Sequence, residues 1–398
     1  MFLIRREIAP ILLGLVIVIA GCEVLEPTAP PAEELLDGPV EGLNNSETAQ
    51  FLRGDLAFNN KVFTTSTGLG PLFVATSCGS CHLGDGKGHP FTTLTRFGQS
   101  DASGNQFVHL GGPQLQNRAI PGFTPETIPA GAGYAKFTPP ANTGLGYLDA
   151  VSDVEILARA DPADSDGDGI SGVPNWVELK NYLTPRPNSI KQSGKYIGRF
   201  GKKASTYDLL QQTATAYNQD IGITSSFENV DTYSNLKTDP EITNKQIQDV
   251  VFYLMTLKAP IRREKNDAGE GEPVFETIGC EKCHRKEFQT VLSDINALSG
   301  KTIYPYTDLL LHDMGDELDD GYTEGSALTN EWKTPPLWGL GLSKNSQGGE
   351  YFLLHDGRAR SIEEAILLHG GEGLSSKENF ESLSLDEKKR LIRFLESL

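Results

Sequence analysis

The chain has 398 residues, 38% of them hydrophobic, with 42 glycines and 23 prolines. This length allows two or three domains with a sizeable core, and the glycine and proline content indicates a loop-rich globular protein. A formal net charge of −18 argues against nucleic acid and anionic lipid surfaces as partners.

The N-terminus is typical of a targeting segment. Arg5 and Arg6 precede an apolar run, 8–20, that is too short for a comfortable transmembrane span. Small residues before Cys22 resemble a bacterial lipobox, in which that cysteine becomes lipidated. We expect a lipoprotein signal peptide over 1–21, a membrane anchor on Cys22 and a tether over 22–45. An uncleaved anchor and a plain signal peptide are the alternatives.

Two C-x-x-C-H strings are the strongest signal in the chain: Cys78-Gly-Ser-Cys81-His82 and Cys280-Glu-Lys-Cys283-His284. This string is the attachment signature of a c-type haem, in which the histidine becomes an axial ligand of the iron. Zinc or disulfides would be the alternative. However, zinc-binding pairs lie about 15–20 residues apart, whereas these strings lie about 200 apart. The sequence therefore predicts two covalently bound haem c groups, with His82 and His284 as proximal ligands.

The haem strings and the export signal agree on a compartment. Haem is attached to such strings outside the bacterial cytoplasm, and the chain carries an export signal. We expect a membrane-anchored lipoprotein in the bacterial periplasm or at the cell surface.

The stretch from Phe91 to about Lys203 is rich in glycine, proline, threonine and aspartate, and predicts loops with short helices over a haem pocket. Within it, Asp164, Asp166 and Asp168 alternate before a glycine, as at the start of an EF-hand calcium loop. The twelfth position holds Asn175 in place of the usual glutamate. The sequence allows a Ca²⁺ ion on the three aspartates, and an acidic solvated turn is the alternative.

Two amphipathic helices with capping boxes close the two halves of the chain. Thr243 and Gln246 start one, and Ser384 and Glu387 start the other. Each follows a haem string, as in a small cytochrome c domain. The expected fold is mainly α with many loops, in two cytochrome c-like haem domains. These are an N-terminal domain over 46–262 with the calcium loop as an insertion, and a C-terminal domain over 268–398.

The sixth ligand of each iron separates an electron carrier from a catalyst. Met314 is the predicted distal ligand of the second haem, because thioether ligation raises a haem potential, and His312 is the alternative. His89 or His109 could cap the first iron. Three other candidates are expected to pack or to hold haem propionates: Met255, His355 and His369.

Further strings resemble the di-haem cytochrome c peroxidase superfamily, and most closely its bacterial di-haem oxidoreductase branch, labelled peroxidases or thiol oxidoreductases. They are Gly144–Asp149, Asp164–Gly172, Gly198–Gly201, Pro305–Gly315, Trp332–Trp338 and Leu354–Ala359.

The resemblance implies a peroxide site at the N-terminal haem, electron entry at the C-terminal haem, a calcium ion between the domains and an acid/base group near the open iron. It assigns that group to Glu155 or to Gln114, with Gln116 as an alternative, because peroxide heterolysis needs a proton moved between the two oxygens. A tryptophan between the haems would be Trp176, Trp332 or Trp338.

The sequence thus predicts a di-haem c-type oxidoreductase that acts as a peroxidase. Its expected partners are an electron-donor protein (a small cytochrome or cupredoxin) and peroxide or another small oxidant, with no nucleic acid. A non-enzymatic electron-transfer cytochrome with two six-coordinate irons is the alternative, and a sensing or binding lipoprotein is a third possibility.

Overall fold

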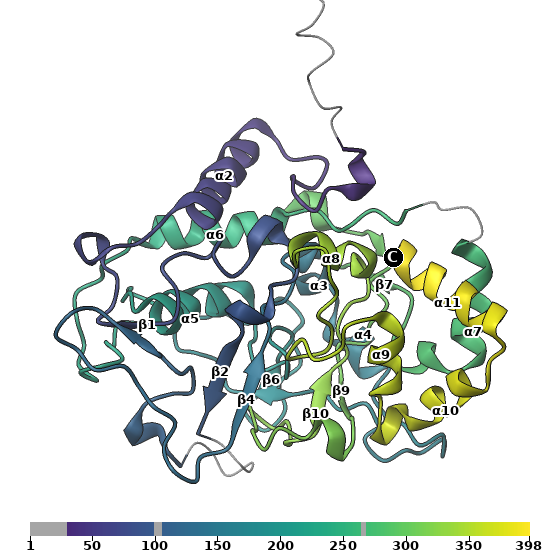
Figure 1. Ribbon diagram of the computed structural model, residues 1–398. Helices are drawn as coiled ribbons and strands as arrows, with labels where there is room; N and C mark the ends of the chain where they lie inside the picture. Colours follow the sequence, from purple (N-terminus) through teal and green to yellow (C-terminus); the bar gives the residue numbers. More distant parts are fainter. Residues whose placement is uncertain (1–29, 99–105, 264–267) are drawn as a thin grey trace, which may run out of the picture.

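The computed structural model describes residues 30–98, 106–263 and 268–398, so the expected signal peptide, Cys22 and the first part of the tether lie outside it. Helices are the main regular structure, and long loops join them (Figure 1). The α-helices are α2 (Asn45–Asp55), α3 (Leu145–Asp149), α4 (Asp153–Leu157), α5 (Leu209–Ile221), α6 (Asn244–Thr256), α7 (Glu272–Thr277), α8 (Ser343–Ser346), α9 (Ile362–Leu367), α10 (Leu374–Ser382) and α11 (Leu385–Ser397).

The strands are short and form antiparallel pairs, which the sequence analysis did not foresee. The pairs are β1 (Leu72–Phe73) with β3 (Arg118–Ala119), β2 (Leu94–Phe97) with β4 (Tyr134–Phe137), β5 (Trp176–Val177) with β6 (Tyr196–Ile197), β7 (Phe288–Gln289) with β8 (Thr302–Ile303), and β9 (Leu311–Asp313) with β10 (Glu331–Lys333). Each is too short to form a core layer, so these pairs pin loops together around the helices.

The predicted tether is shorter than expected. Val40 is buried, and its backbone N–H donates to the Thr256 carbonyl at the end of α6 over 2.8 Å. Pro39 forms a β-bridge with Leu257. The folded part of the chain therefore begins near residue 38 and not at residue 46.

Helices α2, α5 and α6 pack around one apolar cluster in the N-terminal half (Figure 1). The predicted capping box of α6 is present, because the Thr243 side chain accepts from the Gln246 N–H and Gln246 bonds back to Thr243. Where α2 crosses α6, a Cβ at Gly54 would lie 2.1 Å from the Asp249 carbonyl oxygen. Only glycine allows this close approach of the two helices.

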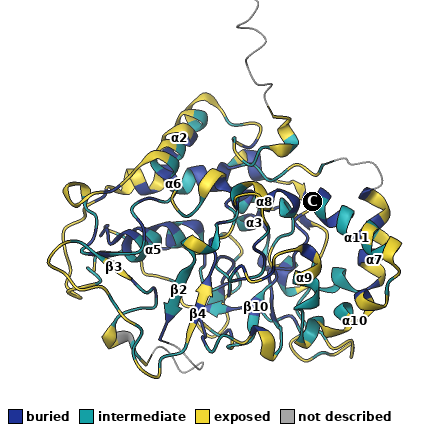
Figure 2. Ribbon diagram, in the orientation of Figure 1, coloured by how far each residue is buried: buried dark blue, intermediate teal, exposed yellow. Residues whose placement is uncertain are grey.

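The C-terminal half repeats this crossing with α7 and α11. The Ser384–Glu387 capping box starts α11 as predicted. A Cβ at Gly271, just before α7, would lie 2.2 Å from the Arg390 carbonyl oxygen on α11. The last turns of α6 and α11 are buried while α2 and α10 present exposed faces, as Figure 2 shows. Each half therefore has an early helix and a closing helix that cross at a glycine.

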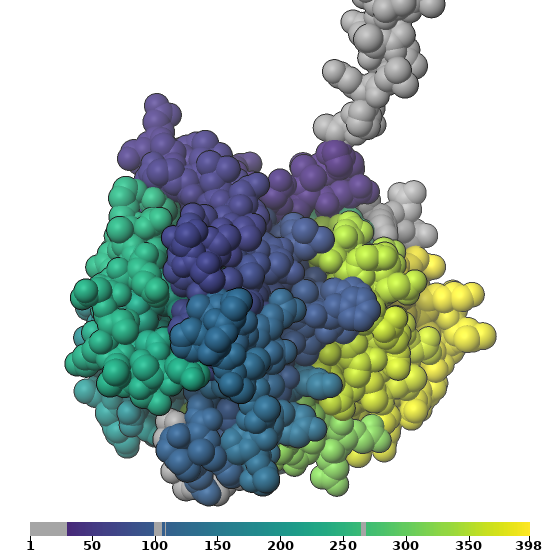
Figure 3. Space-filling view, turned by 60° about the vertical axis from the view of Figure 1, so that its left-hand side comes forward, coloured from purple at the N-terminus to yellow at the C-terminus, as the bar shows by residue number. Residues whose placement is uncertain are grey.

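The two halves share a broad contact. The segment after the first haem string lies against the α8 region, where blue and lime surfaces meet in Figure 3. There the Ser346 hydroxyl donates to the Lys87 carbonyl over 2.8 Å, and the Gln347 amide donates to the Gly88 carbonyl over 2.8 Å. Among the described residues, no helix is long and apolar enough to cross a membrane.

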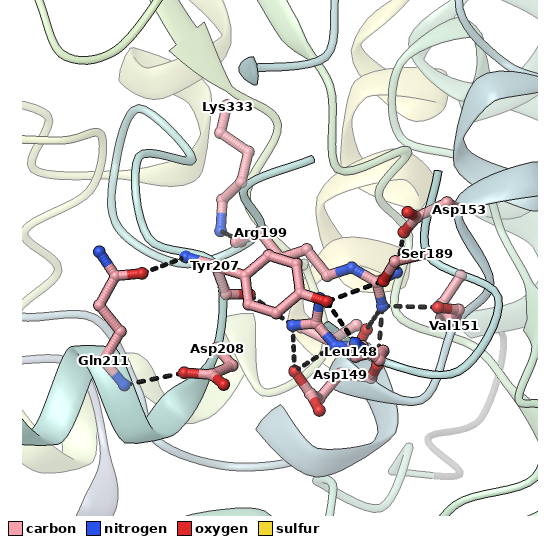
Figure 4. A network of polar contacts seen from close by, with 11 residues as sticks. Leu148, Asp149, Val151, Asp153, Ser189, Arg199, Tyr207, Asp208, Gln211 and Lys333 are labelled. Atoms are coloured by element: carbon pink, nitrogen blue, oxygen red, sulfur yellow. Dashed lines mark hydrogen bonds and ion pairs between the residues drawn. The ribbon is translucent and has the colours of Figure 1, made fainter. Parts of the chain in front are cut away.

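A buried arginine organises the segment between the halves (Figure 4). The Arg199 side chain is 1% exposed; it donates to the backbone carbonyls of Leu148, Asp149 and Val151 and pairs with Asp153. A charge this deep is costly unless it is paired and hydrogen-bonded, and four oxygens surround this guanidinium. The string Gly198–Gly201 thus holds the turn after α3 in place.

Candidate haem sites

Both C-x-x-C-H strings form tight turns of the same kind. In the first, the N–H groups of Cys81 and His82 donate to the Cys78 carbonyl, each over 3.0 Å. In the second, the His284 N–H donates to the Cys280 carbonyl over 3.0 Å. All four cysteines are free thiols. None is committed to a disulfide, so all four remain available for thioether bonds.

The two histidines have one free ring nitrogen each. His82 Nδ1 donates to the Pro140 carbonyl, and His284 Nδ1 donates to the Tyr306 carbonyl, both over 3.0 Å. A carbonyl oxygen can only accept a hydrogen bond, so Nδ1 carries the proton and Nε2 carries the lone pair in both neutral rings. Burial lowers the pKa of each ring to about 4 and keeps it neutral. A neutral, oriented imidazole is what an iron ligand requires, so both strings fit a c-type haem.

The aromatic packing beside each histidine is also repeated. Phe58 lies four residues after Gly54, with ring centroids 5.6 Å from Tyr253 on α6 and 5.7 Å from His82. Phe275 lies four residues after Gly271, 5.4 Å from Phe394 on α11 and 6.5 Å from His284.

The apolar clusters around these rings include Cys78 in one half and Cys280 in the other. The two haem sites therefore rest on equivalent scaffolds.

The surroundings of the first string contain a half-buried carboxyl. Burial raises the pKa of Asp220, near the end of α5, to about 7, and the positive charge of Arg96 only partly opposes this. Burial and then the charge of Asp220 raise the pKa values of both the Cys78 and Cys81 thiols. Asp220 therefore lies near the cysteines of the first string, with a pKa suited to proton transfer near neutral pH.

Three lysines also gather at this site. Burial lowers the pKa of Lys202 to about 8, and burial and then the charge of Lys202 lower the pKa of Lys333 to about 8. The same two causes hold the pKa of Lys87 well below its ordinary value. The charge of Lys202 also contributes to lowering the pKa of His82. The three lysines and His82 are thus close in space. The charge of Asp356 opposes burial and raises the pKa values of Lys202 and Lys87.

The second string has acidic surroundings. His312 Nε2 lies 2.8 Å from Asp308 Oδ2, and its Nδ1 lies 2.5 Å from Glu372 Oε2 and 3.6 Å from Cys283 Sγ. Burial disfavours the charged ring, but the bonds to Asp308, Cys283 and Glu372 outweigh it and hold the pKa of His312 well above its ordinary value. Both ring nitrogens of His312 are engaged, so neither is free for iron.

The loop that carries Asp164, Asp166 and Asp168, called the acidic loop below, lies against this second site. A carboxylate oxygen of each of Asp164, Asp166 and Asp168 lies within 4.8 Å of the others. Asp168 pairs with Lys282 of the second string over 3.0 Å. Asn175, at the twelfth position, is fully buried, and its amide bonds the Lys203 and Glu324 carbonyls. Asn175 is therefore a structural residue and not a ligand of the loop.

The predicted catalytic residues are dispersed. Glu155 is half-buried and accepts over 3.2 Å from the N–H of Gln289, which belongs to the C-terminal half. Gln114 is buried, pairs with Arg96 through a β-bridge, and leaves its Oε1 without a partner. Gln116 bonds the Leu72 carbonyl. Gln114 thus lies beside Arg96, whose charge lowers the pKa of Asp220 at the first site. The catalytic roles of Glu155, Gln114 and Gln116 stay predictions.

The predicted iron ligands differ in their settings. Met314 packs against the cluster of Phe137, Leu318 and Trp332, and its role as a ligand stays a prediction. His355 stacks on Trp332 with ring centroids 3.6 Å apart, and its Nε2 lies 2.7 Å from Asp320. These contacts agree with the structural role expected for His355.

The remaining candidates lie elsewhere. His89 lies between the rings of Phe91 and Phe352, His109 is exposed, and Met255 packs in the cluster around α6. Trp176 is half-buried on β5 and Trp338 packs against the cluster around Leu148.

Comparison with known proteins decides the family. A family described as "Di-haem oxidoreductase, putative peroxidase" matches residues 133–398. The chain belongs to this family. The match includes the second haem string and the acidic loop, and it begins after the first string. A search of curated proteins found no matching relative.

The structure is also similar to a solved structure of Kuenenia stuttgartiensis hydrazine synthase. The identity is 14%, with 94% of each chain covered and a TM-score of 0.41.

Asp220 and Lys202 were not among the predicted site residues, because they lie far from either haem string in sequence. Neither belongs to a motif, and only the packing of α5 and of the loop before α5 brings them to the first site. The shared Gly-x-x-x-Phe spacing at Gly54 and Gly271 was a detectable signal, because it aligns the two halves before each haem string.

Proposed function

We propose that this family member is a di-haem c-type enzyme built from two cytochrome c-like domains, with a peroxide site at the N-terminal haem and electron entry at the C-terminal haem. The repeated helix crossing, the repeated phenylalanine and the two equivalent histidines support two such domains. The family description supports the oxidoreductase class.

The observation that carries the direction of electron flow is the half-buried Asp220 near the first string. Its pKa of about 7 allows it to take up and release a proton at neutral pH. The second string has His312 between two carboxylates instead, and there both carboxylates are already occupied by the ring. Asp220 therefore offers the first site a carboxyl that can transfer a proton near neutral pH beside the cysteines.

His82, Asp220 and Arg96 would have different roles at the first site. When bound, the haem supplies an iron that exchanges electrons one at a time. His82 would hold the haem through Nε2. Asp220 would accept a proton from one peroxide oxygen and return it to the other, so that the O–O bond breaks and the second oxygen leaves as water. Two electrons from the donor protein and two protons from solvent would convert the remaining oxygen to water. The positive charge of Arg96 stabilises the ionised Asp220 between the two transfers.

Three further assignments complete the proposal. The electron donor is a small cytochrome or cupredoxin that delivers electrons near the second string. Lipidated Cys22 anchors the protein to a membrane in the periplasm or at the cell surface. The loop with Asp164, Asp166 and Asp168 binds Ca²⁺, for which the convergence of the three carboxylates is the support.

The test is the rate of peroxide reduction by the reduced di-haem protein with Asp220→Asn. We expect a loss of about 10²- to 10⁴-fold, the usual contribution of a positioned acid/base. Asp208→Asn is the matched control, because Asp208 caps the same helix and asparagine caps equally well. An unchanged rate in Asp220→Asn would assign the proton transfer to another group.

A further inference from the structure

Two consecutive lysines, Lys202 and Lys203, differ in how their ammonium groups are bonded. Lys203 is buried, and its Nζ donates to three backbone carbonyls of 328–331 over 2.7–3.2 Å. An ammonium group has three N–H donors, so Lys203 is fully satisfied. Among the described residues, the Nζ of Lys202 has no hydrogen-bond acceptor. Lys203 therefore has a structural role, whereas Lys202 has all its donors to spare.

Two more lysines with spare donors lie beside Lys202. Lys333 is on β10; its backbone N–H donates to the Lys202 carbonyl and its Nζ to the Arg199 carbonyl, both over 3.0 Å (Figure 4). Lys87 follows the first haem string, and its Nζ donates to the Leu354 carbonyl over 3.2 Å. Each of these two ammonium groups uses one of its three N–H donors on a described residue. We call Lys87, Lys202 and Lys333 the lysine cluster.

The charge of the lysine cluster is not balanced by the surrounding chain. Burial and then the charge of Lys202 lower the pKa values of Lys87 and Lys333, so the three amines lie close together. Asp356 is the carboxylate that acts on them, but both its oxygens accept from Arg358, over 3.1 and 2.8 Å. Among the described residues, no carboxylate forms an ion pair with any of the three lysines. Buried charges without partners are costly, so the cluster requires anions.

The lysine cluster lies inside the protein and close to the first haem string. Each side chain is surrounded by protein atoms and still keeps part of its surface accessible, so it faces a space inside the protein. Burial first, and also the charge of Lys202, lower the pKa of His82. The charges that act on the Cys81 thiol are instead those of Asp220 and Arg118. The cluster is therefore a neighbour of the histidine, whereas Asp220 is the charged neighbour of the cysteines.

A haem supplies the anions that the lysine cluster lacks. Its two propionates are carboxylates, and they leave the macrocycle at the edge opposite the vinyl groups that form thioether bonds. A haem bonded to Cys78 and Cys81 therefore directs its propionates away from both cysteines. Ammonium groups bind carboxylates through charge-assisted hydrogen bonds, which are about twice as strong as neutral ones. The first haem and the lysine cluster are thus complementary in charge and in position.

We propose that the lysine cluster binds the two propionates of the first haem. This inference rests on the proposed haem at Cys78 and Cys81. Because Lys87 belongs to the N-terminal half and Lys333 to β10 in the C-terminal half, the propionates also fasten the two halves together. A small free anion such as chloride offers the same chemistry, and the experiment distinguishes the two sources.

The test is the resonance Raman spectrum of the full-length di-haem protein with Lys87→Met and, separately, with Lys333→Met. A propionate that loses a hydrogen bond bends at lower frequency, so we expect one component of the propionate-bending band to shift down in each variant. The reduction potential of that haem should also fall, because a positive charge that favours the reduced iron is removed. Lys87→Arg keeps the charge and the donors and should leave the band in place.

Lys203→Met is the matched control, because it removes a neighbouring buried ammonium group that carbonyls already satisfy. It should leave the propionate band unchanged. Unchanged bands in both Lys87→Met and Lys333→Met would overturn the assignment. An absorption spectrum that depends on added sodium chloride in the wild type, and loses this dependence in both variants while the propionate band stays, would assign the cluster to a free anion instead.

The proposed function is read separately, from the haem content and the reaction with peroxide. Shifted propionate bands in a protein that never reacts with peroxide would keep the lysine assignment and refute the peroxidase. A protein that reacts with peroxide and shows unchanged bands would keep the proposed function and refute the lysine assignment. A chain without a haem on Cys78 and Cys81 would refute both.

Discussion

The two haem strings share a scaffold and differ in what surrounds it. In both, a glycine allows two helices to cross, a phenylalanine four residues later packs near the haem histidine, and that histidine donates Nδ1 to a carbonyl over 3.0 Å. The first site adds Asp220 and three lysines, and the second adds His312 paired with two carboxylates. The repeated scaffold thus has two different surroundings, made by residues outside the repeat.

The largest effect that could break this comparison is the pH dependence of peroxide reduction. Asp220 must be ionised to accept the first proton. Since its pKa is about 7, the rate should rise by about tenfold per pH unit below pH 7 and level off above it. In the Asp220→Asn protein, the rate should no longer rise with pH below pH 7. A wild-type profile that is flat between pH 5 and 8 would contradict the role of Asp220.

Arg199→Met tests whether the scaffold between the sites is common to both. Removing the guanidinium leaves Asp153 buried without its partner, so we expect a loss of about 3–5 kcal/mol in the free energy of unfolding. Both haem spectra should stay intact at low temperature. The control is Lys245→Met, whose exposed ion pair is worth less than about 1 kcal/mol. Equal effects in the two variants would argue against this scaffold.

Lys202→Met tests whether the positive charge of the lysines affects the first haem and not the second. A positive charge at about 10 Å, with an effective dielectric constant of about 20, stabilises a reduced haem by about 1.7 kcal/mol, or about 70 mV. We expect the reduction potential of the first haem to fall by about 70 mV and that of the second haem to stay unchanged. The exposed Lys136→Met should change neither. A shift confined to the second haem would reverse the placement of the cationic group.

The smallest expected effect concerns the acidic loop. Ca²⁺ that binds only the folded protein should raise its melting temperature by a few °C at saturating concentration. Asp166→Asn should remove this shift, whereas Asp231→Asn, in an exposed turn elsewhere, should keep it. The same melting temperature with Ca²⁺ and with a chelator would leave the loop as an acidic turn.

The features that could be predicted from the sequence are those that depend on residues close together in the chain. The haem strings, both capping boxes and the helices that follow them depend on neighbours a few residues apart, and the structure confirms the two helices. The short strand pairs and the docking of Val40 depend on partners far away in sequence, and they were not foreseen. The pairing of His312 with Asp308 and Glu372 has the same cause, because Glu372 lies 60 residues further along the chain.

The EPR spectrum of the di-haem protein, before and after one-electron reduction, tests the central claim most directly. The account predicts one haem that stays low-spin, and a second haem that becomes high-spin and reacts with peroxide. Two low-spin haems that remain inert to peroxide after reduction would contradict it and would make the protein an electron carrier.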